Sequence, residues 1–146
     1  MVDRHARDLA AEALQQLLDG LVTNDEYESK YPEAETDPAV KAIFVAVWFH
    51  YSDMREHKLT GKYEPGENAR NAMQRCVLFL RGDLEFKWPV PHLSLLNGVI
   101  RLLGLGILVE KRTQRALAGG DQNVWPFFKQ VDYLAALRQP QSNASQ

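Results

Sequence analysis

The sequence predicts a mainly α-helical protein: a single-domain bundle of five to six helices around a central helix at about residues 38–58. Two observations predict this fold. Apolar residues recur at helical spacing in several segments, and capping residues stand at the ends of those segments. A chain of 146 residues is one domain of common size. We therefore expect one globular unit over residues 1–138 and a disordered polar tail over residues 139–146.

The first two helices are predicted from residues 4–21 and from a capping box. In residues 4–21 the apolar side chains fall at helical spacing, and Gly20 stands where a helix would begin to end. Thr23 and Glu26 match the capping-box pattern, in which a threonine cap is followed three positions later by a glutamate. The short helix that this box opens should end before Pro32, because the residue before a proline resists helical geometry.

The strongest signal predicts the central helix. Asp37 is a good N-cap, and Pro38 suits the first helical position, where a missing N–H costs nothing. A wide apolar stripe with the period of a helix follows. The stripe consists of Val40, Ile43, Phe44, Val47, Trp48, Tyr51 and Met54. We expect Gly61 to end this region.

A second strong helix is predicted within "EPGENARNAMQRCVLFLRG", residues 64–82, with Gly82 as its C-terminal cap. After a short connection it should run antiparallel to the central helix, which places residue 83 near the start of that helix. Residues 84–90 then alternate apolar and charged side chains, which indicates an irregular or short-strand segment.

The last third of the chain gives weaker signals. We expect an apolar helix at residues 92–104 and a long loop around residues 106–127. A short helix around Val131, Leu134 and Leu137 should close the fold.

Composition narrows the class of function. The net charge is −2, from 17 basic and 19 acidic residues, which argues against a domain built mainly to neutralise phosphates and therefore against nucleic acid as a partner. The single cysteine, Cys76, excludes an intrachain disulfide and suits a reducing cytoplasm. The apolar segment at residues 93–109 is slightly short for a bilayer and carries Arg101, so we expect it in the core and not in a membrane.

The stretch "HYSDMREH" contains a candidate metal or catalytic site. If the central helix continues through it, His50, Asp53 and His57 share one flank, at the border of the buried face. The two histidines would lie roughly 10.5 Å apart along the helix axis, which is too far to share one ion unless both side chains bend inward. Asp53 with His57, or His50 with Asp53, could each give two ligands, and the other ligands would come from elsewhere. The alternative is that these residues form hydrogen bonds or pack at the edge of the core.

Two acidic segments, "GDLEFKWP" and "GDQNVWPFF", each place an aspartate after a glycine and end in or near Trp-Pro. If both line one cleft, Asp83, Glu85 and Asp121 converge there and make a carboxylate-based site.

The same two segments carry large aromatic residues, which suit a protein interface. We therefore take Trp88, Trp125 and Phe127, together with Asp83 and Glu85, as candidate partner contacts. The alternative is that the aromatic side chains cover one end of the helical core.

Several pieces of the chain together resemble a group of small bacterial proteins of unknown function. The pieces are "TNDEYE", "DPAVKAIF", a tryptophan followed by "YSDMREHKLTG", "FLRGDLEFKWP" and "GDQNVWPFFKQVDY". The resemblance spans residues 9–136. Where the group has a serine between the arginine and aspartate of the fourth piece, this chain has Gly82. The resemblance implies a bacterial, cytoplasmic setting and no particular chemistry.

These observations favour a non-enzymatic protein–protein interaction module, either a homo-oligomer or a binder of one partner such as a toxin in the manner of an immunity protein. We expect no cofactor and identify no small-molecule ligand. The alternative is a metal-dependent or carboxylate-based enzyme that uses the residues named above. A third hypothesis is a nucleic-acid module that contacts phosphate through the basic run at residues 110–115.

Overall fold

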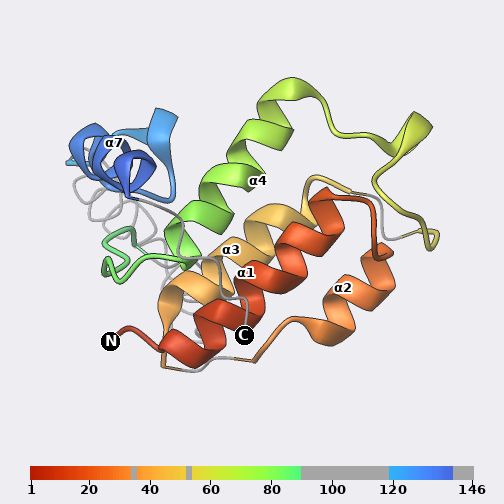
Figure 1. Ribbon diagram of the computed structural model, residues 1–146, viewed down its shortest axis with the longest axis horizontal. Coiled ribbons are helices and arrows are strands. Elements are labelled where there is room, and N and C mark those ends of the chain that lie inside the picture. The colour runs from red at the N-terminus through yellow and green to blue at the C-terminus, as the bar shows by residue number, and fades with distance from the viewer. Residues whose placement is uncertain (34–35, 52–53, 90–118, 140–146) are drawn as a thin grey trace, which may run out of the picture.

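The computed structural model describes residues 1–33, 36–51, 54–89 and 119–139, and these are mainly helical, as predicted (Figure 1). Within them lie five α-helices and two 3-10 turns, and no strand. The elements are α1 (Arg4–Leu18), α2 (Asn24–Lys30), α3 (Pro38–Trp48), η1 (Gly61–Tyr63), α4 (Glu67–Leu80), η2 (Gln122–Val124) and α7 (Gln130–Arg138).

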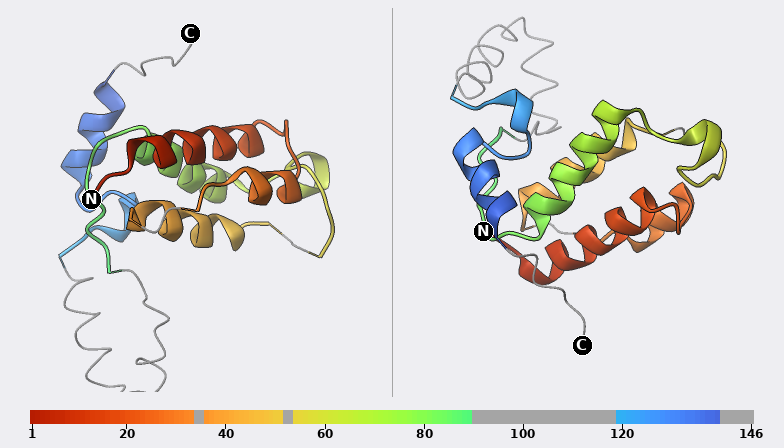
Figure 2. Two further views of the ribbon diagram at one scale, coloured as in Figure 1. Left: turned by 90° about the horizontal axis from the view of Figure 1, so that it is seen from below. Right: turned by 45° about the horizontal axis from the view of Figure 1, so that its top comes forward.

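Helices α1, α3 and α4 run along a common direction, with α4 antiparallel to the other two (Figures 1 and 2). Helix α1 contacts α2, α3 and α4, and its contact with α4 is the most extensive between any two of these helices. Helix α7 packs against α4. The antiparallel course of α4 brings its C-terminal end beside the start of α3, as the sequence predicted.

Side-chain caps fix where the first three helices begin. Asp3 caps α1. Thr23 and Glu26 form the complete capping box of α2, which ends before Pro32 as predicted. Asp37 caps α3 and accepts a hydrogen bond from a backbone N–H of its first turn. Each cap satisfies backbone donors that a helix start otherwise leaves without a partner.

Helix α3 ends at Trp48, so the predicted extent to about residue 58 is wrong. Phe49 is the C-cap, and the N–H of His50 donates to the carbonyl of Val47 at 2.8 Å, closing a final turn. Phe49, His50 and Tyr51, which follow Trp48, all have lower helix propensity than alanine or leucine. Gly61 instead begins η1 with φ = 57°, a left-handed conformation that glycine adopts readily.

The core lies between α1, α2, α3 and α4 and continues to residues 124–127. Its fully buried large side chains include Leu14, Leu17, Tyr27, Ile43, Met73, Phe79, Leu80 and Phe127. Burying one such side chain contributes about 1.5–3 kcal/mol. Burial also raises the pKa of the Cys76 thiol to about 12, so this cysteine is neutral and packs as a small hydrophobic residue.

Parts of the later predictions fall on described residues. Residues 84–89 form an irregular segment, η2 lies inside the predicted long loop, and α7 is the predicted closing helix. The predicted helix at residues 92–104, the loop residues 106–118 and tail residues 140–146 lie outside the described residues. No helix in the described part of the chain is long and apolar enough to cross a membrane.

Candidate functional site

His57 lies in the connection between α3 and α4, where it fastens that connection to the start of α2. Its backbone N–H donates to Oδ1 of Asn24 at 2.8 Å, and the N–H of Asn24 donates back to the carbonyl of His57 at 3.0 Å. Its Nδ1 lies 2.7 Å from the carbonyl oxygen of Arg55, which only accepts, so Nδ1 carries the proton. The ring packs on Tyr63 with centroids 4.1 Å apart. These contacts give His57 a structural role.

His50 does not share a helix flank with His57, because α3 ends before either residue. His50 is exposed and His57 is buried. Asp53 lies outside the described residues. The premise that one continuous helix presents all three residues is therefore wrong, and in the described part of the chain no three His, Cys, Asp or Glu side chains come together to hold a metal ion.

The carboxylates Asp83, Glu85 and Asp121 each have a separate neighbour. Asp83 forms an exposed ion pair with Arg4 at 3.2 Å, and Glu85 lies 3.9 Å from the N-terminal amine. Asp121 caps η2 and accepts hydrogen bonds from Asn123. Among the described residues these three carboxylates do not form a cluster that could hold a metal ion.

The aromatic residues of the same two segments do meet. Nε1 of Trp88 donates to the carbonyls of Pro126 and Phe127, both at 3.1 Å. Trp88 and Phe127 are buried, and Trp125 packs against Phe86. Trp88 and Phe127 therefore belong to the core, which corrects the prediction that they contact a partner.

Close packing at this junction also constrains the backbone. A Cβ atom on Gly120 would come within 2.6 Å of the Trp88 ring and 2.9 Å of the Phe128 ring, so only glycine fits there without displacement. The shared glycine–aspartate pattern thus marks a close approach of the second segment to Trp88.

The structure adds a buried ion pair between Arg7 and Asp37, which are 1% and 0% exposed. Nε of Arg7 is 2.6 Å from Oδ2 of Asp37, and Nη2 is 3.2 Å from Oδ1. Nη1 donates to the carbonyls of Gly82 and Leu84 at 3.0 and 2.8 Å. One guanidinium therefore joins the start of α3 to the end of α4.

Hydrogen bonds keep Asp37 ionised. Burial alone would raise the pKa of its carboxyl, but hydrogen bonds from Arg7 and from the backbone N–H groups of Asp3 and Ala39 outweigh burial and hold that pKa below its usual value. Both charges are thus compensated, as a buried pair requires. The sequence contains a signal for this buried ion pair. Arg7 lies on the same helix face as Ala10 and Leu14, and an arginine on an apolar face indicates a buried anionic partner.

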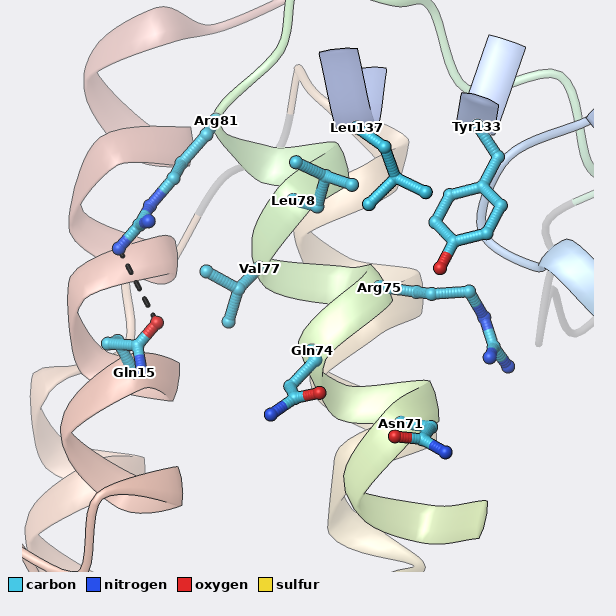
Figure 3. Close-up of a pocket in the computed structure, with 9 residues that line it drawn as sticks. All are labelled: Gln15, Asn71, Gln74, Arg75, Val77, Leu78, Arg81, Tyr133 and Leu137. Atoms are coloured by element: carbon cyan, nitrogen blue, oxygen red, sulfur yellow. Dashed lines mark hydrogen bonds between the residues drawn. The ribbon is translucent and has the colours of Figure 1, made fainter. Parts of the chain in front are cut away.

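A groove about 490 Å³ in volume runs over the outer face of α4, between α1 and α7 (Figure 3). We call it the α4 groove. Its lining residues are Gln15, Asn71, Gln74, Arg75, Val77, Leu78, Arg81, Tyr133 and Leu137. Among these described residues are two arginines and three carboxamides, and neither aspartate nor glutamate.

Large apolar side chains are exposed on the last turns of α3. Trp48 and Phe49 follow Val45 by three and four positions, so both lie on the same face as Val45. We call these three residues the α3 patch. Phe49 is 75% exposed and Trp48 is 40% exposed, and their rings meet edge to face with centroids 5.5 Å apart. The α3 patch and the α4 groove share no residue.

No protein-family model, curated protein sequence or solved structure matches this chain. The resemblance to small bacterial proteins stays a prediction. Arguments about function consequently begin from the α3 patch.

Proposed function

We propose that this protein is a non-enzymatic interaction module that associates with a second copy of itself through the α3 patch. The exposure of Phe49 and Trp48 at the end of α3 carries the proposal. A few aromatic residues commonly supply most of the binding energy at a protein interface, and tryptophan is among the most enriched of them.

The arrangement of the patch supports an interface. The edge-to-face contact of Trp48 and Phe49 limits the freedom of both rings before binding. Aromatic side chains held in this way lose less entropy on association than long flexible ones. Val45 extends the same apolar face by one helical turn.

The absence of formal charge in the sequence around the patch favours a second copy as the partner. Between Lys41 and Asp53 the chain contains no aspartate, glutamate, lysine or arginine. In a two-fold interface the same surface meets itself, so any charge near the axis would face its like. An uncharged patch avoids that repulsion, whereas a surface selected for a charged partner would carry the opposite charge.

Sedimentation velocity over a range of protein concentrations tests the proposal. We expect a reversible dimer of the unaltered chain, and we expect Phe49→Ser to weaken dimerisation by about tenfold or more, since losing an aromatic anchor costs at least about 1.4 kcal/mol. The matched control is Val131→Ser, which also replaces an exposed apolar residue but lies on α7.

Three outcomes would contradict the proposal. One is a chain that stays monomeric at every concentration. Another is a dimer that Phe49→Ser leaves intact. The third is a large loss of stability in Phe49→Ser, which would show that Phe49 belongs to the core of a single chain.

The proposal also includes the cellular compartment and the origin of the protein. The single cysteine supports a reducing cytoplasm, and the resemblance described above supports a bacterial origin. Fractionation of host cells checks the first point: recovery of the protein in the cytoplasmic fraction supports it, and recovery in an extracytoplasmic fraction contradicts it.

A further inference from the structure

We propose that α7 pairs with α7 of a second copy of this chain in antiparallel orientation, through its exposed apolar face and the opposite charges at its two ends. The pairing uses a surface separate from the α3 patch, so this inference goes beyond the proposed function and does not depend on it. Where both surfaces are occupied, the α7 contact joins two dimers into a larger assembly.

Helix α7 exposes large apolar side chains. Val131, Leu134 and Leu137 are 65%, 42% and 55% exposed, and none of the residues of α7 is buried. The helix packs on the core through Tyr133 and Ala136, which are partly buried. Val131 and Leu134 lie three positions apart on the opposite face of the helix. Neighbouring exposed apolar side chains on one helix face are typical of an interaction surface.

The charges of α7 make the helix complementary to itself. Asp132 lies in its first turn and Arg138 in its last. Side chains on one helix meet when three or four positions separate them, so these two residues, six positions apart, do not pair within one helix. A two-fold axis at Ala135 turns the helix end over end and places Asp132 level with the partner's Arg138. The opposite charges then meet twice in the pair.

The centre of α7 also suits a second copy as the occupant. Ala135 is exposed and small, and small side chains at a crossing let two helix axes approach toward the lower end of the usual 8–10 Å range. Leu134 and Val131 can then pack around the crossing point. Antiparallel pairing further brings the positive end of each helix dipole beside the negative end of the other. The charges at both ends and the small residue at the centre thus fit the same two-fold axis.

The exposed face of α7 and the α3 patch lie toward opposite ends of the bundle. Helix α7 packs against α4 at the end where the N-terminus and the start of α3 lie, whereas the patch is at the end of α3 (Figures 1 and 2). One interface therefore leaves the other accessible. Two different two-fold interfaces on one chain link dimers into a tetramer.

The α7 pairing should be weaker than association through the α3 patch. A helix of nine residues gives an interface at the low end of the usual sizes, and valine and leucine seldom dominate binding as tryptophan does. We expect a dissociation constant of roughly 0.1–1 mM in Phe49→Ser, which isolates the α7 contact. In more dilute solution the α3-patch dimer forms alone, so Val131→Ser remains a control for that dimer.

Sedimentation equilibrium of charge variants, all made in the Phe49→Ser chain, tests the pairing. Arg138→Glu makes both ends of α7 negative, and Asp132→Arg makes both ends positive. Each variant alone should associate at least about tenfold more weakly than its Phe49→Ser parent, because every like-charge contact occurs twice in a two-fold pair. An equimolar mixture of the two variants should recover the association, since opposite charges again meet at both ends.

The matched control is a mixture of Arg55→Glu and Asp25→Arg in the same parent. These substitutions change the net charge by the same amounts at exposed positions outside α7. The control mixture should associate no more tightly than the parent. Recovery in the α7 mixture also shows that both charge variants fold, so a loss in either one alone reports on pairing. Leu134→Ser should weaken the association as well, because it removes apolar surface beside the crossing.

Three results would overturn the pairing: a Phe49→Ser chain that stays monomeric up to about 1 mM, an Arg138→Glu variant that associates as its parent does, or an α7 mixture that recovers no association. Failure of the α3 patch gives a different result. In that case Phe49→Ser leaves the dimer of the unaltered chain intact at low concentration, whatever the charge variants of α7 do.

Discussion

The two ends of α3 are built in opposite ways. At the N-terminal end, Asp37 is fully buried, caps the helix and is paired with Arg7. At the C-terminal end, Phe49 and Trp48 are apolar and exposed. A charge lies where apolar groups are normally found, and aromatic rings lie where charges are normally found. The first end stabilises this chain, and the second is the surface that we propose contacts another chain.

This difference separates structural residues from candidate functional ones. The buried charge is compensated at every oxygen and joins three helix ends, so its removal should affect the fold. The exposed rings contact each other and project outward, so their removal should spare the fold and affect association. Stability measurements on variants of both ends therefore test the comparison directly.

The largest effect should come from Asp37→Asn. Asparagine is as good an N-cap as aspartate, so the substitution removes the charge and leaves the cap. The guanidinium of Arg7 then stays buried without its anion, which should lower the free energy of unfolding by about 3–5 kcal/mol. Urea denaturation measures this change. Asp83→Asn, which breaks an exposed pair with Arg4, is the control and should change stability little.

Lowering the pH should gradually remove the contribution of the ionised Asp37 to the free energy of unfolding. Because the pKa of Asp37 is lower in the folded chain than in the unfolded chain, the unfolded state binds the proton more tightly. The contribution is fully present above about pH 4–5 and is lost as the pH falls below the usual aspartate pKa of about 3.9. We expect the stability difference between the unaltered chain and Asp37→Asn to shrink over that range. A difference that is constant from neutral pH to about pH 2 would contradict the lowered pKa.

Two tyrosines near α3 should respond in opposite directions. The hydroxyl of Tyr31 donates to the carbonyl of Val40 at 2.8 Å in the first turns of α3, so Tyr31→Phe should cost about 1 kcal/mol. The buried hydroxyl of Tyr27 has no hydrogen-bond partner among the described residues, so Tyr27→Phe should be neutral or stabilise by up to about 1 kcal/mol. Thermal unfolding compares the pair, and equal losses in both would show that a partner of Tyr27 exists in solution.

Trp48→Ser should lower stability much less than Asp37→Asn does. Its side chain is partly exposed at the end of α3, so we expect a loss of about 0.5–1 kcal/mol in the free energy of unfolding. Urea denaturation at a protein concentration where the chain is monomeric checks this value. A loss as large as that of Asp37→Asn would mean that the two ends of α3 do not differ in function.

Local signals in the sequence predicted the helix starts well. The capping box at Thr23 and the pairing of Asp37 with Pro38 are confirmed because caps depend on residues within one turn. The end of α3 was missed because the apolar stripe continues past Trp48 although the helix does not. Periodicity reports which face is apolar, and it does not report where the backbone hydrogen bonds stop.

The candidate sites were harder to predict than the helix starts, because they depend on contacts between residues that are far apart in the sequence. The pairing of Arg7 with Asp37 joins positions thirty residues apart, and only the placement of an arginine on an apolar face indicated it. The α4 groove needs α7 beside α4, which sequence periodicity does not determine. Trp88 and Phe127 illustrate a third case: their meeting was anticipated, but aromatic residues suit a core and an interface equally, and burial decided between them.

Arg4 and Arg7 also have a consequence for synthesis on the ribosome. Both side chains donate to backbone carbonyls at the end of α4: Arg4 to those of Leu80 and Gly82, and Arg7 to those of Gly82 and Leu84. Translation proceeds at about 5–20 residues per second, so α1 waits several seconds before these acceptors exist. During that interval the apolar face of α1 lacks α4, its most extensive neighbour. A nascent chain stalled before Leu84 should therefore expose α1 to chaperones and proteases, and a chain extended well past Leu84 should protect it.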